Sequence, residues 1–208
     1  MIEDSLRRAP ATEAEWLGPL PVRAWFAHPE RRLEIDLGCG KGRFLLARAA
    51  KSPDVNFLGI DRMLRRIRKV DNRARRLDLD NVRLMRVEGY YAVAHLMPAA
   101  AVRTYYIFHP DPWPKARHAK RRMMNDGPVD LIAAKLRPGG EFRFGTDHAV
   151  YVRHALMVMR RHTGQFEWLC DGPQNFQNRP GSWPETRYEA KARNVYGHEV
   201  WYFRYRRR

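Results

Sequence analysis

The chain has 208 residues, of which 44% are hydrophobic and 12% aromatic, a composition that predicts one folded domain and excludes an intrinsically disordered protein. No apolar run approaches the roughly 20 residues of a membrane span, and no apolar signal segment follows the charged N-terminus. Lysine and arginine total 39 against 23 aspartate and glutamate residues, and the net charge of +16 favours a polyanionic partner, with nucleic acid ahead of a membrane surface. The alternative is a basic protein whose charge serves only solubility.

The cysteines and histidines show no pattern of a redox or metal site. Cys39 and Cys170 form no such motif, and two cysteines are too few for a disulfide framework. The histidines lack metal-ligand spacing. We therefore expect a cytoplasmic protein that needs no metal and contacts no membrane.

Strands and helices alternate along most of the chain. Residues 1–30 contain four prolines and no periodicity, so we expect an N-terminal arm that packs on a domain formed by residues 31–208. Strands are predicted at 32–37, 56–61, 82–87, 102–108, 141–146, 166–170 and 199–206. Helices are predicted at 43–50, 63–77, 129–136 and 151–162, the third of them ended by Arg137-Pro-Gly-Gly.

This alternation predicts an α/β fold with a Rossmann-like, doubly wound, mostly parallel seven-stranded sheet and helices on both faces. In such sheets, ligands bind beyond the carboxyl ends of the strands. Several unusual residues follow predicted strands directly, namely residues 36–42, Asp61, Glu88, Asp111 and Thr146-Asp147. A binding site is therefore expected at this edge of the sheet.

A glycine turn follows the first predicted strand. Gly38, Gly40 and Gly42 have the spacing G-x-G-x-G, one residue short of the turn that holds a pyrophosphate, and the spacing also differs from that of a P-loop. With Asp36 before it, the turn suits a cofactor that has a cationic amino-acid end, such as S-adenosylmethionine. A plain strand-to-helix turn is the alternative.

Two further acids support a cofactor site. Asp61 ends the second predicted strand about 20 residues past the glycines, where a carboxylate can accept both ribose hydroxyls. Glu88 ends the third strand, where it can meet the adenine edge. Each could instead be an ordinary surface-loop acid, but acids at three successive strand ends favour a methyltransferase-type cofactor site.

Residues 107–122 read IFHPDPWPKARHAKRR. Because proline fixes φ and removes a backbone donor, the part with Pro110, Pro112 and Pro114 can be neither a helix interior nor a central strand. We interpret it as a rigid connector that holds Asp111 next to a run of basic residues. A carboxylate that merely caps a turn is the alternative role for Asp111.

Several motifs together resemble the bacterial tRNA (guanine-N7-)-methyltransferase family, and the resemblance extends from about Leu33 to the C-terminus. The motifs are Asp36-x-Gly-x-Gly-Lys-Gly, Gly59-Ile-Asp61, Pro110-Asp-Pro-Trp-Pro-Lys115 with RHAKRR behind it, Gly145-Thr-Asp147 and Thr186-Arg-Tyr-Glu189. The resemblance implies a class I methyltransferase fold that uses S-adenosylmethionine to methylate N7 of guanine at position 46, in the variable loop of tRNA.

The resemblance also implies a role for each residue of the motifs. Asp111 would be catalytic and would also contact the cofactor, which is held by Asp36, Gly38, Gly40, Gly42, Asp61 and Glu88. The substrate would be bound by Lys115, Asp147, Thr186, Arg187, Tyr188 and Glu189. RNA phosphates would be contacted by Arg117, His118, Lys120, Arg121 and Arg122. The expected protein is a monomer or homodimer that binds tRNA.

Some residues depart from the family pattern. Asp36 and Asp61 replace Glu, Glu88 replaces Asp, His109 replaces Phe, and Arg187-Tyr188 replace Lys-Phe. The acid-for-acid changes alter reach by one methylene and keep the charge. A methyltransferase that acts on another RNA or a small molecule, and a non-catalytic RNA-binding protein, are the alternative functions.

A second basic segment lies on the predicted helix at 63–77. We interpret it as a solvated helix face, made of Arg65, Arg66, Arg68, Lys69, Arg73, Arg75 and Arg76.

Overall fold

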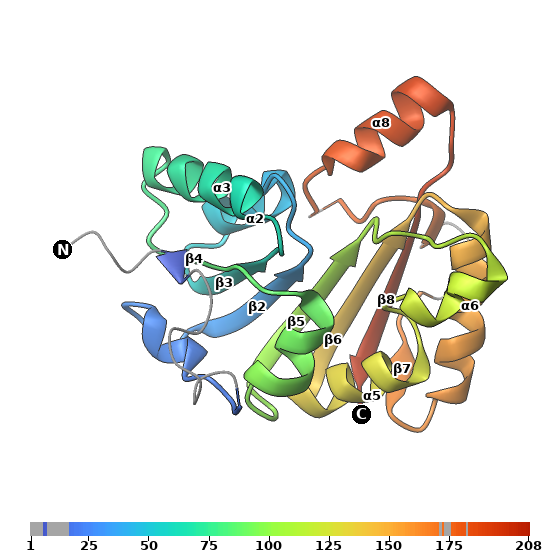
Figure 1. Ribbon diagram of the computed structural model, residues 1–208, viewed down its shortest axis with the longest axis horizontal. Helices are drawn as coiled ribbons and strands as arrows, with labels where there is room; N and C mark the ends of the chain where they lie inside the picture. Colours follow the sequence, from blue (N-terminus) through green and yellow to red (C-terminus); the bar gives the residue numbers. More distant parts are fainter. Residues whose placement is uncertain (1–5, 8–16, 171, 173–175, 182) are drawn as a thin grey trace.

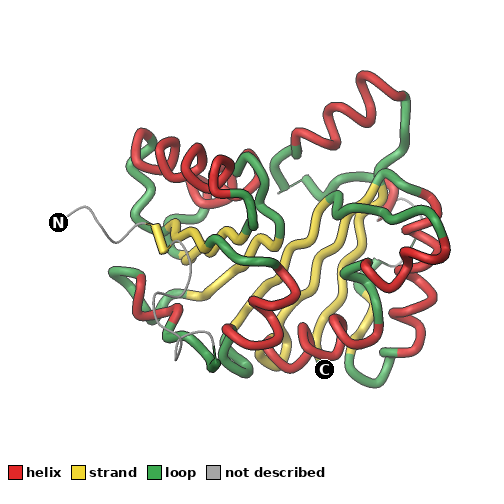
Figure 2. Tube along the Cα trace, viewed as in Figure 1, coloured by secondary structure: helices red, strands yellow, loops and turns green. Residues whose placement is uncertain are grey.

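The computed structural model describes residues 6–7, 17–170, 172, 176–181 and 183–208. These residues form an eight-stranded sheet with the strand order β1-β4-β3-β2-β5-β6-β8-β7 (Figures 1 and 2). The strands are β1 (Leu6–Arg7), β2 (Arg32–Leu37), β3 (Val55–Ile60), β4 (Val82–Met85), β5 (Val102–Phe108), β6 (Leu136–Thr146), β7 (Phe166–Trp168) and β8 (Trp201–Arg207). Neighbouring strands are parallel except at β8, which is antiparallel to β6 and to β7.

Helices connect most of these strands. They are α2 (Arg43–Lys51), α3 (Leu64–Arg76), α4 (Gly89–Tyr91), α5 (Asp126–Lys135), α6 (Ala149–Arg161) and α8 (Arg187–Tyr196). Shorter helical segments are η1 (Val22–Trp25), η2 (Ala92–Leu96) and η3 (Ala116–Arg121). In the part of the chain that the structure describes, no helix has both the length and the apolar character that crossing a membrane requires.

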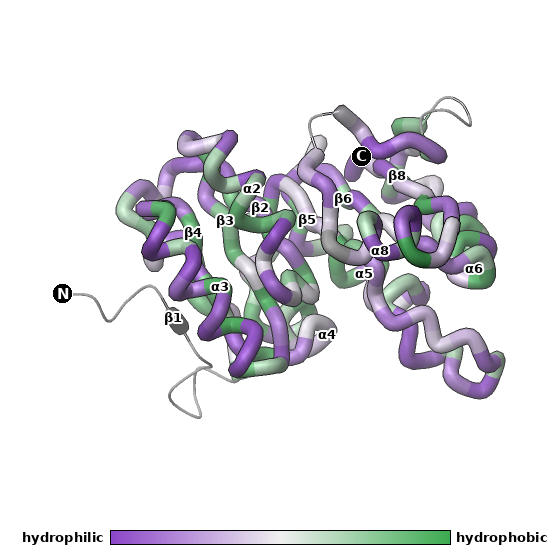
Figure 3. Tube along the Cα trace, turned by 90° about the horizontal axis from the view of Figure 1, so that it is seen from above, coloured by the Kyte–Doolittle hydropathy of each residue, from purple (hydrophilic) through white to green (hydrophobic). Residues whose placement is uncertain are grey.

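The hydrophobic core lies on both faces of the sheet because side chains alternate along each strand. In β3, Val55 and Phe57 belong to the cluster under α2 and α3, whereas Leu58 and Ile60 belong to the cluster that η2, α5 and α6 cover. Figure 3 shows this hydropathy pattern: β3 is mainly hydrophobic, and in α3 beside it hydrophilic and hydrophobic residues alternate.

The predicted Rossmann-like, doubly wound α/β sheet is confirmed, and all seven predicted strands belong to it. The sheet has one more strand, β1, within residues that the sequence predicts to be irregular, and it pairs with β4 as the edge strand. β6 begins at Leu136 rather than at residue 141, so the segment Pro138-Gly139-Gly140 does not end the sheet pairing. The register with β5 shifts between Val102 and Thr104, and this irregularity accommodates the segment.

The described part of the predicted N-terminal arm packs into the core. Leu20, Val22 and Phe26 are buried in the same cluster as the strands, and the backbone N–H of Leu20 donates to the carbonyl of Leu96 at 2.8 Å. Residues 1–5 and 8–16 of the arm lie outside the described residues, so the division at residue 30 stays a prediction.

The carboxyl ends of the central strands are aligned with one another. Asp36 in β2 pairs with Gly59 in β3 and with Tyr106 in β5, so these strands end at one edge of the sheet. A Cβ atom at position 59 would lie 2.5 Å from a methyl group of Leu45, so only glycine lets α2 pack this closely on β3. The functional site lies at this edge.

Candidate functional site

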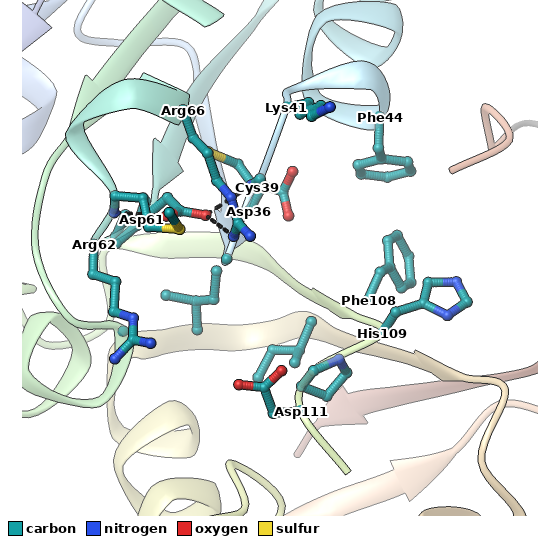
Figure 4. Close-up of a pocket in the computed structure, with 18 of the residues that line it drawn as sticks. Asp36, Cys39, Lys41, Phe44, Asp61, Arg62, Arg66, Phe108, His109 and Asp111 are labelled. Carbon is teal, nitrogen blue, oxygen red and sulfur yellow. Dashed lines mark hydrogen bonds and ion pairs between the residues drawn. The ribbon is translucent and has the colours of Figure 1, made fainter. Parts of the chain in front are cut away.

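A pocket of about 550 Å³ opens at the carboxyl ends of β2, β3 and β5 (Figure 4). Of the residues predicted to form the site, its lining includes Asp36, Gly38, Gly40, Asp61, Glu88, Asp111, Thr186 and Tyr188. Figure 4 shows Asp111 across the pocket from Asp36 and Asp61. The fold therefore brings together residues that are up to 152 positions apart in the sequence, from Asp36 to Tyr188.

The glycine turn is held against β3 by its backbone. Gly38, Gly40 and Gly42 have φ angles of +83°, +57° and +70°, which L side chains rarely adopt. The N–H groups of Gly38 and Cys39 donate to the carbonyl of Ile60 at 2.8 and 3.0 Å. This arrangement directs the turn and its N–H groups toward the end of β3.

Gly42 is predicted to contact the cofactor, but the structure places it outside the pocket lining. A Cβ atom there would lie 2.6 Å from a methyl group of Val70. The glycine therefore allows α3 to pack against the turn.

Asp61 is firmly held at the end of β3. Its side chain is buried and accepts hydrogen bonds from the N–H groups of Gly40 at 3.1 Å and Met63 at 2.8 Å. The guanidinium of Arg66 lies 3.2 Å from the same carboxylate. These contacts hold the carboxylate at the pocket in a fixed orientation.

In the described part of the chain, Asp36, unlike Asp61, is buried without polar groups that stabilise its charge. It is only 5% exposed, and no hydrogen bond to its carboxylate is found among the described residues. Burial, together with the nearby charge of Asp61, raises the pKa of Asp36 to about 7. A buried carboxylate in this state favours a cationic group beside it.

Glu88 lines the pocket and also caps a helix. Its carboxylate accepts hydrogen bonds from the N–H groups of Tyr90 at 3.0 Å and Tyr91 at 2.8 Å, at the start of α4. The side chain is exposed, so both roles are sterically compatible.

The proline segment presents Asp111 at the pocket, and Arg122 holds the segment from behind. The guanidinium of Arg122 donates to the carbonyls of Pro112 at 2.9 Å and Trp113 at 2.8 Å, and the residue is 6% exposed. The structure thus places the Arg122 side chain in support of the loop, and its predicted RNA contact stays a prediction. The other predicted RNA contacts lie on or beside η3, where Arg117, Lys120 and Arg121 are exposed.

His109 forms a contact that the sequence pattern does not predict. Its Nδ1 lies 3.1 Å from a carboxylate oxygen of Asp147, and its ring stacks on Tyr188 with centroids 5.8 Å apart. The side chain is 3% exposed and its backbone has a φ of +48°, an uncommon conformation for a residue with a side chain. His109 thus joins the ends of β5 and β6 to α8.

The segment 186–189 builds the start of α8. The Thr186 hydroxyl accepts from the N–H of Glu189 at 2.9 Å, and the Glu189 carboxylate accepts from the N–H of Thr186 at 3.4 Å, a capping box. Glu189 is fully buried and lies 3.1 Å from Arg179, so the structure gives it a role in the fold, and its predicted substrate contact stays a prediction. Lys115 and Asp147 are not among the lining residues, and the side chain of Arg187 lies outside the described part of the structure, so its predicted substrate contact stays a prediction.

The pocket is also lined by residues that no sequence motif predicts, among them Phe44, Arg62, Arg66 and Phe108. Phe44 and Phe108 pack edge to face with centroids 4.7 Å apart, and they form an aromatic wall. The only local signal is that Arg62 and Arg66 follow Asp61 closely. Within the described ranges, no group of three or more His, Cys, Asp and Glu residues could hold a metal ion.

The chain has the class I methyltransferase fold, a mostly parallel sheet with a glycine turn and acids at its carboxyl edge. The chain is similar in structure to a 16S rRNA methyltransferase, KamB, with a TM-score of 0.61 at 13% identity over 97% of this chain and 98% of that one. It is also similar to a "putative methyltransferase" from Streptococcus mutans in complex with SAH, with a TM-score of 0.53 at 13% identity over 86% and 89%. At these identities the likeness concerns the fold alone.

Sequence relatives narrow the class to a family. Residues 30–202 match the family described as "Putative methyltransferase". A tRNA (guanine-N(7)-)-methyltransferase of Novosphingobium aromaticivorans is 56% identical over 197 residues, 92% of this chain and 82% of that protein. One of Sphingopyxis alaskensis is 55% identical over 196 residues, 92% and 81%. The chain belongs to the tRNA (guanine-N(7)-)-methyltransferase family.

We predict that Asp36→Asn stabilises the protein without ligand. Because the pKa of Asp36 is higher in the folded protein (about 7) than its ordinary value of 3.8, its contribution to stability falls as the pH rises between these values. At pH 8 the variant should gain on the order of 1–4 kcal/mol in unfolding free energy, and the gain should shrink toward pH 4. Urea unfolding at several pH values measures this, with the exposed Asp80→Asn as the control. A gain independent of pH would contradict the prediction.

We predict that His109→Phe raises the pKa of Asp147. The hydrogen bond from His109 holds the pKa of this carboxyl below its ordinary value. Because a phenyl ring has no N–H donor, the substitution should raise that pKa toward its ordinary value. NMR titration of the Asp147 carboxyl measures the change, with His118→Phe as a control at an imidazole that contacts Trp113 instead. An unchanged Asp147 titration in His109→Phe would show that the contact is electrostatically unimportant.

Proposed function

We propose that this protein transfers the methyl group of S-adenosylmethionine to N7 of guanine at position 46, in the variable loop of tRNA. The observation that carries the proposal is one pocket that Asp36, Asp61 and Asp111 all line, in a chain 56% identical to a tRNA (guanine-N(7)-)-methyltransferase. We also infer a cytoplasmic protein, because the proposed substrate is tRNA.

The residues of the pocket fit S-adenosylmethionine. The buried Asp36 carboxylate suits the ammonium group of the methionine part, which would offset the cost of holding that charge away from water. A Cβ atom at Gly38 would meet nothing within 4 Å, so the turn leaves open space beside its backbone. Asp61 suits the ribose hydroxyls, and Glu88 suits the adenine edge. When bound, this cofactor supplies an electrophilic methyl group on a sulfonium.

The proposed reaction needs no general base among the residues around the reacting atoms. Guanine N7 carries a free lone pair, so no base is needed to activate it, and catalysis comes from orientation and electrostatics. Positive charge moves from the cofactor to the purine during the transfer. Asp111 stands at the pocket on a loop that three prolines stiffen and Arg122 holds by two hydrogen bonds, so its carboxylate can stabilise that charge without reorganising.

The target guanine would lie at the end of the pocket near His109. Figure 4 shows His109 remote from Asp36 and Asp61, which leaves the space between for the transfer. Asp147, which His109 holds at 3.1 Å, has acceptor capacity left for the N1 and N2 donors of guanine. Lys115 and the exposed cations of η3 suit phosphates, which orient the RNA.

The proposed function is tested with purified protein, S-adenosylmethionine and unmodified tRNA. We expect 7-methylguanosine in the digested product by mass analysis, and its absence from a tRNA with adenosine at position 46. A methylated base other than 7-methylguanosine, or methylation at another position, would reject the assignment. No methyl transfer to tRNA by a protein that binds the cofactor would reject the function itself.

We predict that Asp111→Asn lowers the single-turnover rate of methyl transfer by about 100-fold or more, comparable to the loss of one oriented electrostatic group. Affinity for cofactor and tRNA should stay within a few-fold, because the carboxylate acts mainly in the transition state. The measurement that tests this is the single-turnover rate of Asp111→Asn at saturating tRNA. Pro112→Ala should lower the same rate less, because it only loosens the position of the Asp111 carboxylate. A rate near that of the wild type would remove the catalytic role of Asp111.

A further inference from the structure

The helix α3 carries an unusual charge distribution. From residue 62 to residue 76 the chain has eight basic residues, Arg62, Arg65, Arg66, Arg68, Lys69, Arg73, Arg75 and Arg76. The one acid in this span is Asp71, which is buried and lies 3.0 Å from Arg75. The side that packs on the sheet is formed by Ile67, Val70 and Ala74.

A stripe of exposed side chains runs along the opposite side of α3. Arg65, Lys69, Asn72 and Arg76 follow one another at steps of four, three and four residues, which places them on one face of a helix. Their neighbour Arg68 is also exposed. We name Arg65, Arg68, Lys69 and Arg76 the α3 basic face.

Part of this face has an electrostatic cost. Like charges at positions i and i+4, such as Arg65 and Lys69, destabilise a helix by a few tenths of a kcal/mol per pair, about 0.2–0.5. Arg65 also lies in the first turn, at the positive end of the helix dipole, although the Asp61 carboxylate beside Arg66 partly offsets the dipole there. A polyanion bound along the face would reduce both costs.

The start of α3 adjoins the pocket. Arg62, two residues before α3, and Arg66, in its first turn, line the pocket, so Arg65 of the α3 basic face is next in sequence to a lining residue. Arg73 donates to the carbonyl of Lys41 in the glycine turn at 3.2 Å. In Figure 1, α3 and α8 stand on the two sides of the upper edge of the sheet, where the strands end. A polynucleotide with one base in the pocket can therefore continue onto α3.

We propose that the α3 basic face binds backbone phosphates of the tRNA substrate, as a second anchor besides η3. The inference rests on the proposed function and adds a second surface that binds the tRNA substrate. RNA fits better than an anionic membrane, because the apolar side of α3 is buried in the core and only Met63 and Leu77, at its two ends, are exposed apolar residues there. The face thus offers charge without an apolar surface to insert into lipid.

The test is a triple variant, Arg65→Gln with Lys69→Gln and Arg76→Gln, which keeps helix-forming residues at exposed positions. The matched control is Lys51→Gln with Arg137→Gln and Arg160→Gln. These three residues are exposed as well, and they stand at the end of α2, the start of β6 and the end of α6, at the amino ends of the parallel strands and away from the pocket. Both variants lower the net charge by the same amount.

Binding of unmodified tRNA is measured against salt concentration. We expect the α3 variant to flatten the slope of log K against log salt by about two to three units, near one per lost phosphate contact, and to weaken binding about tenfold or more. The control should change the slope by less than about one unit. Cofactor affinity should be unchanged in both variants, since Arg66 and Asp61 are intact.

Equal slopes for the two variants would overturn the proposal and leave only a general effect of net charge. Salt-sensitive binding of the wild type to anionic lipid vesicles, lost in the α3 variant while tRNA binding persists, would overturn it as well. A wild type that binds tRNA but forms no 7-methylguanosine would reject the proposed function while the slopes still decide the surface. A wild type that methylates tRNA, with an α3 variant that matches the control, would reject the surface alone.

Discussion

Two buried carboxylates at the ends of neighbouring parallel strands are the constraint on which the site depends. Asp61 is satisfied by the N–H groups of Gly40 and Met63 and by Arg66, whereas Asp36 is left without such partners. The fold therefore keeps one acid in a state that costs stability, as its raised pKa indicates. A cationic ligand group at Asp36 reverses that cost, so the same burial that weakens the free protein favours binding.

The side of the pocket that carries Asp111 is held by a restricted backbone and by hydrogen bonds to it. Three prolines restrict the loop that presents Asp111, and Arg122 ties its carbonyls from the buried side. His109 adds a second tie, because it links the end of β5 to Asp147 after β6 and stacks on Tyr188 of α8. A reaction that needs no proton transfer depends on this kind of positioning.

The positive charge of the protein serves two distinct purposes. Arg122 is buried and acts within the fold, as do Arg66 beside Asp61 and Arg75 beside Asp71. Among the described residues, no ion pair is found for the exposed cations of η3 or of the α3 basic face, although Arg121 lies over the Trp113 ring and Arg117 donates to His118. The net charge of +16 therefore results partly from residues that shape the site and partly from surfaces suited to phosphates.

The sequence by itself determined the sheet, the edge at which the site lies and most of the lining acids, because periodicity and strand-end position are local properties. The spacing of Thr186 and Glu189 also fits a capping box at a helix start, although the family resemblance alone implies substrate contacts for these residues. Only the tertiary structure decided that Gly42 serves packing, that Arg122 is buried and that His109 meets Asp147. Each depends on a neighbour distant in sequence, and neither spacing nor composition encodes such distances.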